Sequence, residues 1–198
     1  MRFPILFAAL LAACTSTVDG ADQPGHSDGA DEAAGVPSAG DTTPYVSASA
    51  LSNDAVPAQS HVFHVVFALV PNEPSGAAID AVVGLSNGPA ANFADLGPIV
   101  RFSPAGMLDV RNGSDYESDL AFPYKAGETY QIRMDVDLGR HLYSVLVQEN
   151  GGHTTSLARN YAFRTEQATV ATLDNAARIV DSATGSLDKI AIDVTAQP

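Results

Sequence analysis

Charged, amide and aromatic side chains that could do chemistry crowd into one stretch of the sequence, residues 109–124, around an Asn-Gly turn signal. Oxygen ligands suit hydroxyl groups or a hard cation such as calcium, and the planar guanidinium fork of arginine suits acidic groups. Tyrosine rings offer flat faces for stacking. We therefore predict a ligand-binding site built from these residues and one arginine further along the chain: Arg111, Asn112, Asp115, Tyr116, Tyr124 and Arg133.

Within this predicted site the arginines would pair with acidic groups, the tyrosines would stack, and Asn112 or Asp115 would hold hydroxyls or a calcium ion. Arg101 and Arg164 lie in expected strands too and could present the same planar forks to acidic sugars. Structural alternatives stay open for all of them. Asx residues are common at turns, tyrosines can close one end of a core, and the arginines can pair with the chain's surplus of carboxylates. The acidic residues fit no EF-hand spacing, so we predict no cofactor and keep calcium as an open alternative.

The residues that catalysis would need do not come together in the sequence. Glu117-Ser118-Asp119 is similar to the E-x-D-x-x-E strand of jelly-roll glycosidases, but Phe122 stands where the third carboxylate would be. Tyr124-Lys125-Ala126-Gly127 is similar to part of a signature of jelly-roll alginate lyases. The Gln-x-His pair of those enzymes is missing, because Arg133 stands two positions after Gln131. We therefore expect a non-catalytic protein, with a polysaccharide lyase or glycoside hydrolase as the alternative.

From residue 61 onward, apolar, aromatic and β-branched runs alternate with Gly, Asn and Pro about every ten residues, which predicts many short antiparallel strands. The clearest alternation, residues 130–138, predicts one buried and one solvated face and a hairpin with residues 140–148. No segment has a convincing helical period. Strands are expected at 61–70, 79–85, 99–103, 107–111, 130–138, 140–148, 161–164, 169–173, 178–181 and 187–194.

The segment from Gly127 to Val147, GETYQIRMDVDLGRHLYSVLV, resembles the central hairpin of laminin-G-like and concanavalin-like jelly rolls. The resemblance implies an all-β, antiparallel two-sheet sandwich whose last strand, residues 187–194, lies near its first. Sugar-binding modules, adhesion modules, glycosidases and lyases all use this fold, so it implies no single activity. We expect a glycan-binding or adhesion module for extracellular or cell-wall glycan. The third alternative is a structural envelope protein that binds another protein.

The N-terminus resembles a bacterial lipoprotein signal: Leu11-Ala12-Ala13-Cys14 follows a short apolar run too short to span a bilayer. The resemblance implies that Cys14, the only cysteine, carries lipid and anchors the protein to a membrane. Thr15 stands where an aspartate would favour retention at the inner membrane, so an outer-membrane location is expected. The predicted organisation is a signal peptide at 1–13, a lipidated flexible acidic linker at 14–60 and a β-sandwich at 61–198.

Composition supports this division and narrows the partners. Residues 15–60 contain no Lys or Arg and almost no large apolar side chains, so they cannot bury enough surface to offset the entropy of ordering. We expect few tertiary contacts before about residue 60. The formal net charge of −13 and the lack of a basic stripe argue against a nucleic-acid partner.

Overall fold

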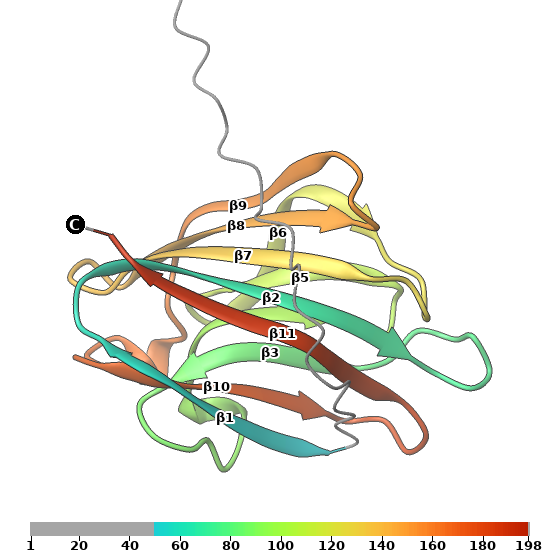
Figure 1. The fold of residues 1–198 in the computed structure, drawn as a ribbon, viewed down its shortest axis with the longest axis horizontal. Helices are drawn as coiled ribbons and strands as arrows, with labels where there is room; N and C mark the ends of the chain where they lie inside the picture. Colours follow the sequence, from blue (N-terminus) through green and yellow to red (C-terminus); the bar gives the residue numbers. More distant parts are fainter. Residues whose placement is uncertain (1–49, 198) are drawn as a thin grey trace, which may run out of the picture. The chain divides into compact units, whose positions relative to one another are not determined.

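Two antiparallel β-sheets packed face to face make up residues 50–197, the part of the chain that the computed structural model describes (Figure 1). No described helix is long and apolar enough to cross a membrane. Two short 3-10 helices, η1 (Phe93–Asp95) and η2 (Thr165–Gln167), lie in connections between strands. The strands are β1 (Leu51–Gln59), β2 (Val62–Asn72), β3 (Ala81–Ser86), β4 (Leu96–Phe102), β5 (Met107–Asn112), β6 (Asp115–Pro123), β7 (Tyr130–Asp137), β8 (Leu142–Glu149), β9 (Thr154–Ala162), β10 (Leu173–Val180) and β11 (Ser186–Ala196).

The strand order confirms the predicted jelly-roll sandwich. One sheet has six strands in the order β1-β10-β3-β4-β5-β6, and the other has five in the order β11-β2-β7-β8-β9. The predicted hairpin is the β7–β8 pair, which begins with Tyr130 opposite Glu149. The last strand, β11, pairs with β2 along nearly its whole length, as the concanavalin-like resemblance implies.

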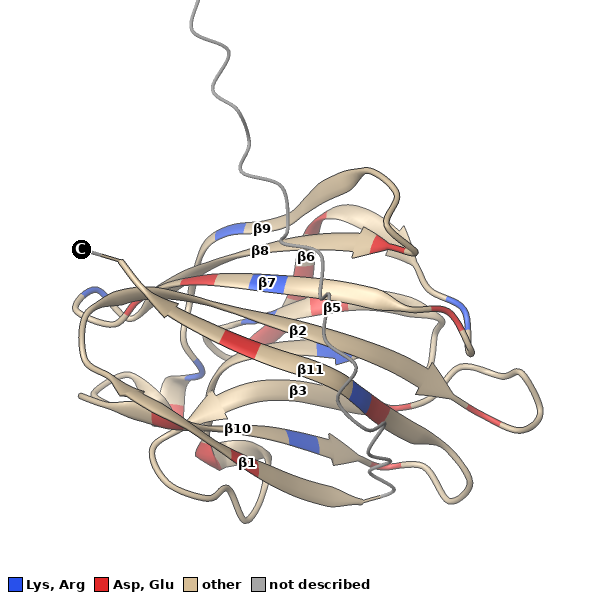
Figure 2. Cartoon of the chain, in the orientation of Figure 1, with Lys and Arg blue, Asp and Glu red and all other residues tan. Residues whose placement is uncertain are grey.

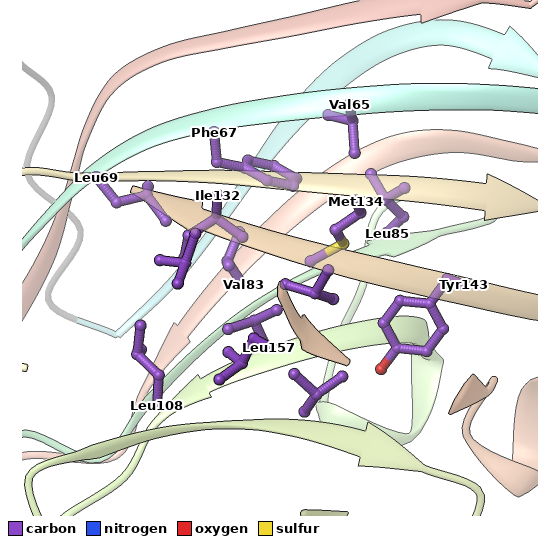
Figure 3. Close-up of a cluster of buried hydrophobic side chains, with 14 of the residues drawn as sticks. Val65, Phe67, Leu69, Val83, Leu85, Leu108, Ile132, Met134, Tyr143 and Leu157 are labelled. Atoms are coloured by element: carbon purple, nitrogen blue, oxygen red, sulfur yellow. The ribbon is translucent and has the colours of Figure 1, made fainter. Parts of the chain in front are cut away.

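The core lies between the two sheets, where alternate side chains of each strand meet (Figure 3). On β7 the burial alternates strictly, with Ile132 and Met134 fully buried and the residues between them partly solvated. Side chains on a strand point to opposite faces in turn, so this alternation is what one covered face requires. Burying a side chain of this size contributes about 1.5–3 kcal/mol. With no disulfide available to the single-cysteine chain, this packing holds the sandwich together.

Strand β1 corrects the predicted domain boundary. The flexible linker was expected to reach residue 60, yet residues 51–59 form the edge strand beside β10. The sequence pattern does not reveal it, because an edge strand with mostly exposed side chains needs no apolar run. The predicted signal peptide, Cys14 and the rest of the linker up to residue 49 lie outside the described residues.

Polar side chains hold β1 in place. Asp54 accepts a hydrogen bond from Nη2 of Arg178 at 3.4 Å and forms an ion pair with Lys189. Arg178 is only 2% exposed and also donates from Nη1 to the Leu187 carbonyl at 2.9 Å. Asn53 accepts from the Asn175 amide at 2.8 Å. A buried guanidinium therefore links the edge strand to β10 and β11.

Two further differences concern polar segments. Strand β6 was expected to be a loop, because its acidic residues suggest turns rather than a strand; it pairs with β5 at the other edge of the six-stranded sheet. Residues 169–173 were expected to be a strand, but all except Leu173 lie in the turn and coil after η2. Val170 packs against the main core from this irregular segment, and pattern alone does not distinguish this from a short strand.

Candidate ligand-binding site

The outer face of the six-stranded sheet carries a pocket of about 290 Å³. Its floor comes from β3, β4 and β6, and its rim from the two 3-10 helices and the end of β10. The volume is near the lower end of the range for small-molecule pockets, roughly 300–1,000 Å³. The lining residues are Asp80, Val82, Phe93, Arg101, Tyr116, Arg164 and Asp181.

The pairing register brings the polar side chains of the floor into a row. Val82 lies opposite Arg101, and Arg101 lies opposite Asp109 on β5. On the next pair of strands, Arg111 lies opposite Tyr116. Because side chains alternate along a strand, Leu108 and Val110 fill the core while their neighbours point outward. The β5–β6 hairpin turns at Gly113-Ser114, one position later than the expected Asn112-Gly113, and Gly113 takes a φ of +59°, which favours glycine.

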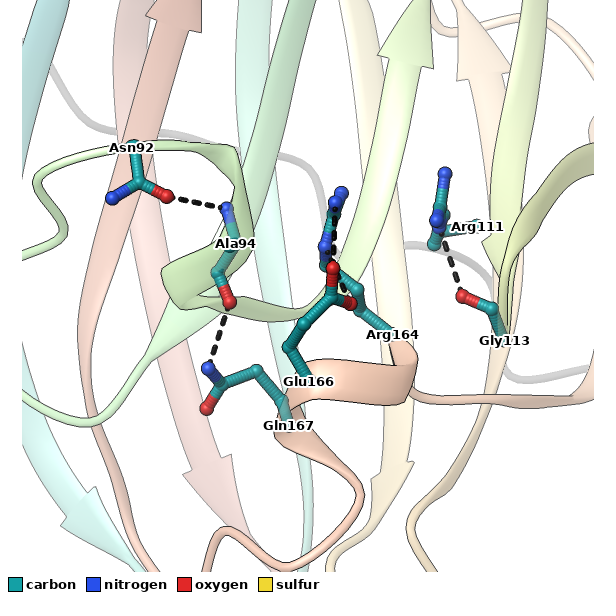
Figure 4. A network of polar contacts seen from close by, with 7 residues as sticks. All are labelled: Asn92, Ala94, Arg111, Gly113, Arg164, Glu166 and Gln167. Atoms are coloured by element: carbon teal, nitrogen blue, oxygen red, sulfur yellow. Dashed lines mark hydrogen bonds and ion pairs between the residues drawn. The ribbon is translucent and has the colours of Figure 1, made fainter.

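The rim is fixed by hydrogen bonds between η1 and η2 (Figure 4). The Asn92 side chain accepts from the Ala94 amide at 2.8 Å, capping η1. Gln167 donates to the Ala94 carbonyl at 2.7 Å, and the Arg164 amide donates to the Gly97 carbonyl at 3.0 Å. Beneath the rim lies a second, smaller apolar cluster of buried residues, with Phe93 and Tyr116 packed against it: Val82, Ala90, Leu96, Ile99, Ala177 and Ile179.

Two guanidinium groups flank the Tyr116 ring. Cζ of Arg101 lies 4.0 Å from the ring centroid and Cζ of Arg111 lies 5.0 Å from it. Arg101 also forms a two-pronged ion pair with Asp109, from Nε at 2.9 Å and from Nη2 at 2.7 Å. Burial raises the pKa of Tyr116, so the ring stays neutral. Tyr116 is therefore an anchor for two arginines rather than a bare stacking platform.

Arg111 is held in place from inside the sandwich. The hydroxyl of Tyr143 on β8 donates to the Arg111 carbonyl at 2.5 Å or to the Ile99 carbonyl at 2.9 Å. On the outer side, Nε of Arg111 donates to the Gly113 carbonyl at 2.9 Å. A core tyrosine of the opposite sheet thus fixes the backbone that presents this guanidinium.

Arg164 supplies a second positive group at the same end of the pocket. Its Nε and Nη2 donate to the two carboxylate oxygens of Glu166 at 3.0 and 3.1 Å. This hydrogen-bonded pair lowers the pKa of Glu166, and the charge of Arg111 acts in the same direction. Figure 4 shows the Arg164–Glu166 pair and Arg111 over neighbouring parts of the sheet.

Two carboxylates stand at the opposite end of the pocket. The Asp181 amide donates to the Asp80 carbonyl at 2.8 Å, which places the two residues side by side on neighbouring chain segments next to β3 and β10. Burial raises the pKa of Asp80; Arg101 opposes this shift, whereas the charges of Asp181 and Asp109 add to it. The pocket therefore has an acidic end as well as a basic end.

Of the predicted site residues, Tyr116 lines the pocket and Arg111 lies beside it against the Tyr116 ring. Asn112 lies next to them but has a structural role, because its Oδ1 accepts from the Ala162 amide at 2.8 Å and its amide group donates to Glu117. Asp115 is exposed on the hairpin, where it accepts from the Ser114 hydroxyl at 2.7 Å. No contact of Asp115 joins it to the pocket within residues 50–197.

Tyr124 was expected to stack on a ligand, and the structure corrects this. Its side chain is 6% exposed, and its ring packs edge-to-face against Phe102 at a centroid distance of 5.1 Å. Its hydroxyl accepts from the Ile79 amide at 2.8 Å and donates to the carbonyl of Ile79 or Ser103. The alternative role, closing one end of the core, is the one that it has.

Arg133 was expected beside Arg111, but it belongs to the other sheet. It lies on β7, where Nε donates to Asp135 at 2.8 Å. Side chains at odd positions of this strand point to the outer face of the five-stranded sheet, because their even-numbered neighbours fill the core. Arg133 therefore cannot join the predicted site.

The acidic residues that suggested calcium are engaged with other side chains. Asp109 pairs with Arg101, Glu117 with Asn112, and Asp119 with the hydroxyl of Tyr161. Among residues 50–197 no three His, Cys, Asp or Glu side chains are grouped so that they could hold a metal ion. Calcium stays the open alternative that it was on the sequence alone.

Sequence reasoning missed Asp80, Asp181 and Phe93. The two aspartates lie far apart in the sequence and meet only because β3 pairs with β10. Phe93 lies in η1, whose Asn92 and Asp95 form a capping box that a search for helix starts could have found.

Comparisons with known proteins find a shared fold and no assigned family. No family model matches. A gellan lyase from Bacillus sp is 28% identical over 106 residues, which is 53% of this chain and 4% of that protein. The solved structure of a sialidase aligns with a TM-score of 0.50 at 15% identity, over 74% of this chain and 14% of that one.

Two further solved structures are similar over most of the domain. A legume lectin-like domain from Entamoeba histolytica has a TM-score of 0.49 at 10% identity, over 78% of this chain and 84% of that one. The catalytic domain of a glycoside hydrolase family 131 protein from Coprinopsis cinerea has a TM-score of 0.47 at 13% identity, over 70% of this chain and 58% of that one. At such identities the likeness is one of fold.

Proposed function

We propose that this protein is a non-catalytic glycan-binding module that takes one sugar residue into the pocket on the outer face of its six-stranded sheet. The pocket carries the proposal, because it gathers hydrogen-bond donors and acceptors around the apolar Val82 and Phe93 side chains and the Tyr116 ring. Sugar rings have the matching chemistry, with hydroxyls that donate and accept around an apolar ring. The names of the compared proteins, which include lectin-like domains and glycan-active enzymes, support the same ligand class.

Binding is tested by titrating the purified protein with a panel of cell-wall and extracellular oligosaccharides in a calorimeter. A bound oligosaccharide should lose affinity about tenfold or more in Arg164→Ala, because a good charge-assisted hydrogen bond contributes roughly 1.5–3 kcal/mol. Arg140→Ala is the matched control, since Arg140 is 69% exposed in the β7–β8 turn. Equal affinity of Arg164→Ala and the unmodified protein would place the binding site elsewhere.

One observation favours glycoside hydrolysis as the second candidate function. Asp80, just before β3, and Asp181, just after β10, lie side by side, joined by the hydrogen bond between the Asp181 amide and the Asp80 carbonyl. Retaining glycosidases use two carboxylates roughly 5 Å apart, and a pair of neighbouring aspartates is what such chemistry needs. The raised pKa of Asp80 would suit a proton donor. Release of reducing ends from an oligosaccharide, abolished in Asp181→Asn, would establish hydrolysis in place of simple binding.

Lyase chemistry has less support. Tyr116, the tyrosine at the pocket, has a raised pKa, so less of it is in the deprotonated form that could accept a proton near neutral pH. Products of a lyase carry an unsaturated sugar that absorbs ultraviolet light, so incubation with uronate polymers gives a direct readout. We expect no such absorbance.

The third alternative, an envelope protein that binds another protein, finds no specific support. The exposed large apolar side chains of the described residues are Leu51, Val62 and Leu120. They lie on β1, β2 and β6, strands that do not pair with one another. Protein-binding surfaces usually need a larger continuous apolar patch.

The lipoprotein part of the proposal rests on the sequence around Cys14. We propose that Cys14 carries lipid and holds the domain at the outer membrane, because a small-small-Cys ending follows a short apolar run. In a bacterial host, the full chain should enter the detergent phase on phase separation, and Cys14→Ser should stay in the aqueous phase. Density fractionation of the membranes then distinguishes the outer from the inner membrane.

A further inference from the structure

The two ends of the pocket differ in charge. Arg164 lines one end, where Arg111 lies just outside the pocket against the Tyr116 ring, and Asp80 and Asp181 line the other. Arg101 lies between them and is neutralised by its two-pronged pair with Asp109. Elsewhere, acidic and basic residues are interspersed over both sheets (Figure 2).

The basic end has one positive charge more than it has carboxylates. Within residues 50–197, Glu166 is the carboxylate that pairs with Arg164, and Arg111 has no ion pair. The contact of Arg111 with Gly113 uses Nε alone. The two terminal nitrogens of Arg111 remain as donors for an acidic group of a ligand.

The Arg164–Glu166 pair is exchangeable. The Glu166 side chain is 48% exposed and lies only two residues from its partner, and exposed pairs of this kind contribute little to stability. A carboxylate of a ligand could take the place of Glu166 at little cost. Glu166 would then return to solvent.

We infer that the pocket takes a sugar residue that carries a carboxylate, a uronate-type unit. Its carboxylate binds between Arg111 and Arg164 and displaces Glu166, while its ring hydroxyls donate to Asp80 and Asp181. This inference rests on the proposed glycan-binding function and names the class of glycan.

The acidic end limits the ligand to one anionic group placed at one side of the ring. A heavily sulfated sugar would bring a second anionic group toward Asp80 and Asp181, where like charges repel. A neutral sugar would leave the donors of Arg111 unused. A uronate satisfies both ends, because its carboxylate and its free hydroxyls lie on different parts of the ring.

The test compares each acidic oligosaccharide with its own methyl ester, which keeps the ring and removes the charge. Tetramers of glucuronate, galacturonate, mannuronate and guluronate are titrated as acid and as ester. For the sugar that fits, we expect the acid to bind at least about tenfold more tightly than the ester. Arg111→Gln should lower the affinity for the acid about tenfold and leave the affinity for the ester unchanged.

Glu166→Gln tests the exchange directly. If Glu166 competes with the ligand, its removal should raise the affinity for the acid about two- to fivefold and leave the ester unaffected. Arg140→Gln serves as the control, and the melting temperature of every variant shows whether it is folded. Arg111→Lys, which keeps the charge and loses the fork, replaces Arg111→Gln should the latter unfold, and it should bind the acid several-fold more weakly.

The possible failures are distinguishable. If an acid and its ester bind equally well and Arg111→Gln has no effect on either, the uronate inference is wrong and glycan binding stands. If neither form of any tetramer binds, yet neutral glycans do, the same conclusion holds. If no oligosaccharide of any class binds, the proposed function itself is wrong.

Discussion

Tyrosines have two roles in this protein: some bind backbone groups through a buried hydroxyl, and one contacts arginines through its ring. Tyr124 and Tyr143 are buried with their hydroxyls on backbone groups, whereas Tyr116 lies at the surface between two arginines. Burial raises the pKa of Tyr124 to about 12, so its hydroxyl keeps its proton at any ordinary pH. The buried hydroxyls therefore act as fixed donors and acceptors between distant segments.

Replacing Tyr124 with Phe should destabilise the domain by about 1–3 kcal/mol. The change leaves the Ile79 amide, which donates to the hydroxyl at 2.8 Å, without that acceptor in a buried place. Urea unfolding of the variant measures the loss. Tyr116→Phe provides the matched control with a smaller expected loss, and an equal loss in both variants would contradict the assigned roles.

Asp80 should lower stability near neutral pH. Its pKa in the folded protein is raised above 3.8, mainly by burial, so folding disfavours its ionised form. The resulting penalty is absent below the unfolded pKa and develops as the pH rises through the folded pKa. Asp80→Asn should therefore melt about 1–2 °C higher at about pH 7 and the same as the original at about pH 3. A gain that is equal at both pH values would show that ionisation is not its cause.

At the residue scale, what the sequence reveals is what lies close together along the chain. Arg111 and Tyr116 are cross-strand neighbours in one hairpin, so a single turn signal at Asn112-Gly113 suffices to bring them together. Arg133 and Tyr124 carry the same chemical groups but belong to another sheet and to the core. The type of a residue does not predict the sheet to which it belongs or the face on which its side chain lies.

At the level of elements, most inner strands are predictable, whereas the two edge strands of the six-stranded sheet are not. Strand β7 alternates between buried and half-solvated residues, and the matching alternation of apolar and polar residues predicts it from the sequence. Strands β1 and β6 occupy the two edges of the six-stranded sheet, where polar and charged residues are favoured because they discourage pairing with other molecules. Because these polar residues interrupt the apolar pattern, the sequence does not predict an edge strand there.

A chain that begins at residue 60 should therefore be much less stable than one that begins at residue 50. Without β1, the edge of β10 loses its partner and Arg178 loses the Asp54 carboxylate inside a buried site. Breaking a buried ion pair alone typically costs about 3–5 kcal/mol. Thermal unfolding should show a melting temperature lower by about 10 °C or more, or aggregation. If the two chains melt at similar temperatures, residues 51–59 contribute little to stability and act as part of the linker.

Strand β3 has one position where backbone approaches backbone. A Cβ placed on Gly84 would lie 2.6 Å from the Pro98 carbonyl oxygen of the neighbouring strand. Gly84→Ala must therefore push β3 and β4 apart, which typically costs about 1–3 kcal/mol. Gly88→Ala is the control. Its Cβ would have open space, so its cost comes from the backbone strain at a φ of +73° and not from packing. Chemical denaturation of both variants measures the two costs, and an unaffected Gly84→Ala would contradict the close approach.

At the scale of the whole molecule, charge sets a condition on ligand capture. The net charge of −13 repels an anionic glycan at a distance, although two arginines would hold it at contact. The Debye length shortens from about 30 Å at 0.01 M salt to about 8 Å at 0.15 M. If the ligand is a uronate, its association rate constant should rise about two- to fivefold over this range. A fall, measured by stopped flow or surface plasmon resonance, would indicate steering by a local positive field instead.

Strand β1 is also the point where the described domain meets the N-terminal part of the chain. Any tension transmitted from that side enters at Leu51, at the outer edge of a sheet, and acts first on the ladder between β1 and β10. Asn53, bonded to Asn175, and then Asp54, paired with Arg178 and Lys189, are the side-chain contacts that resist this tension. Under mechanical load we expect the edge to detach before the two layers separate, so that the sandwich yields in two steps.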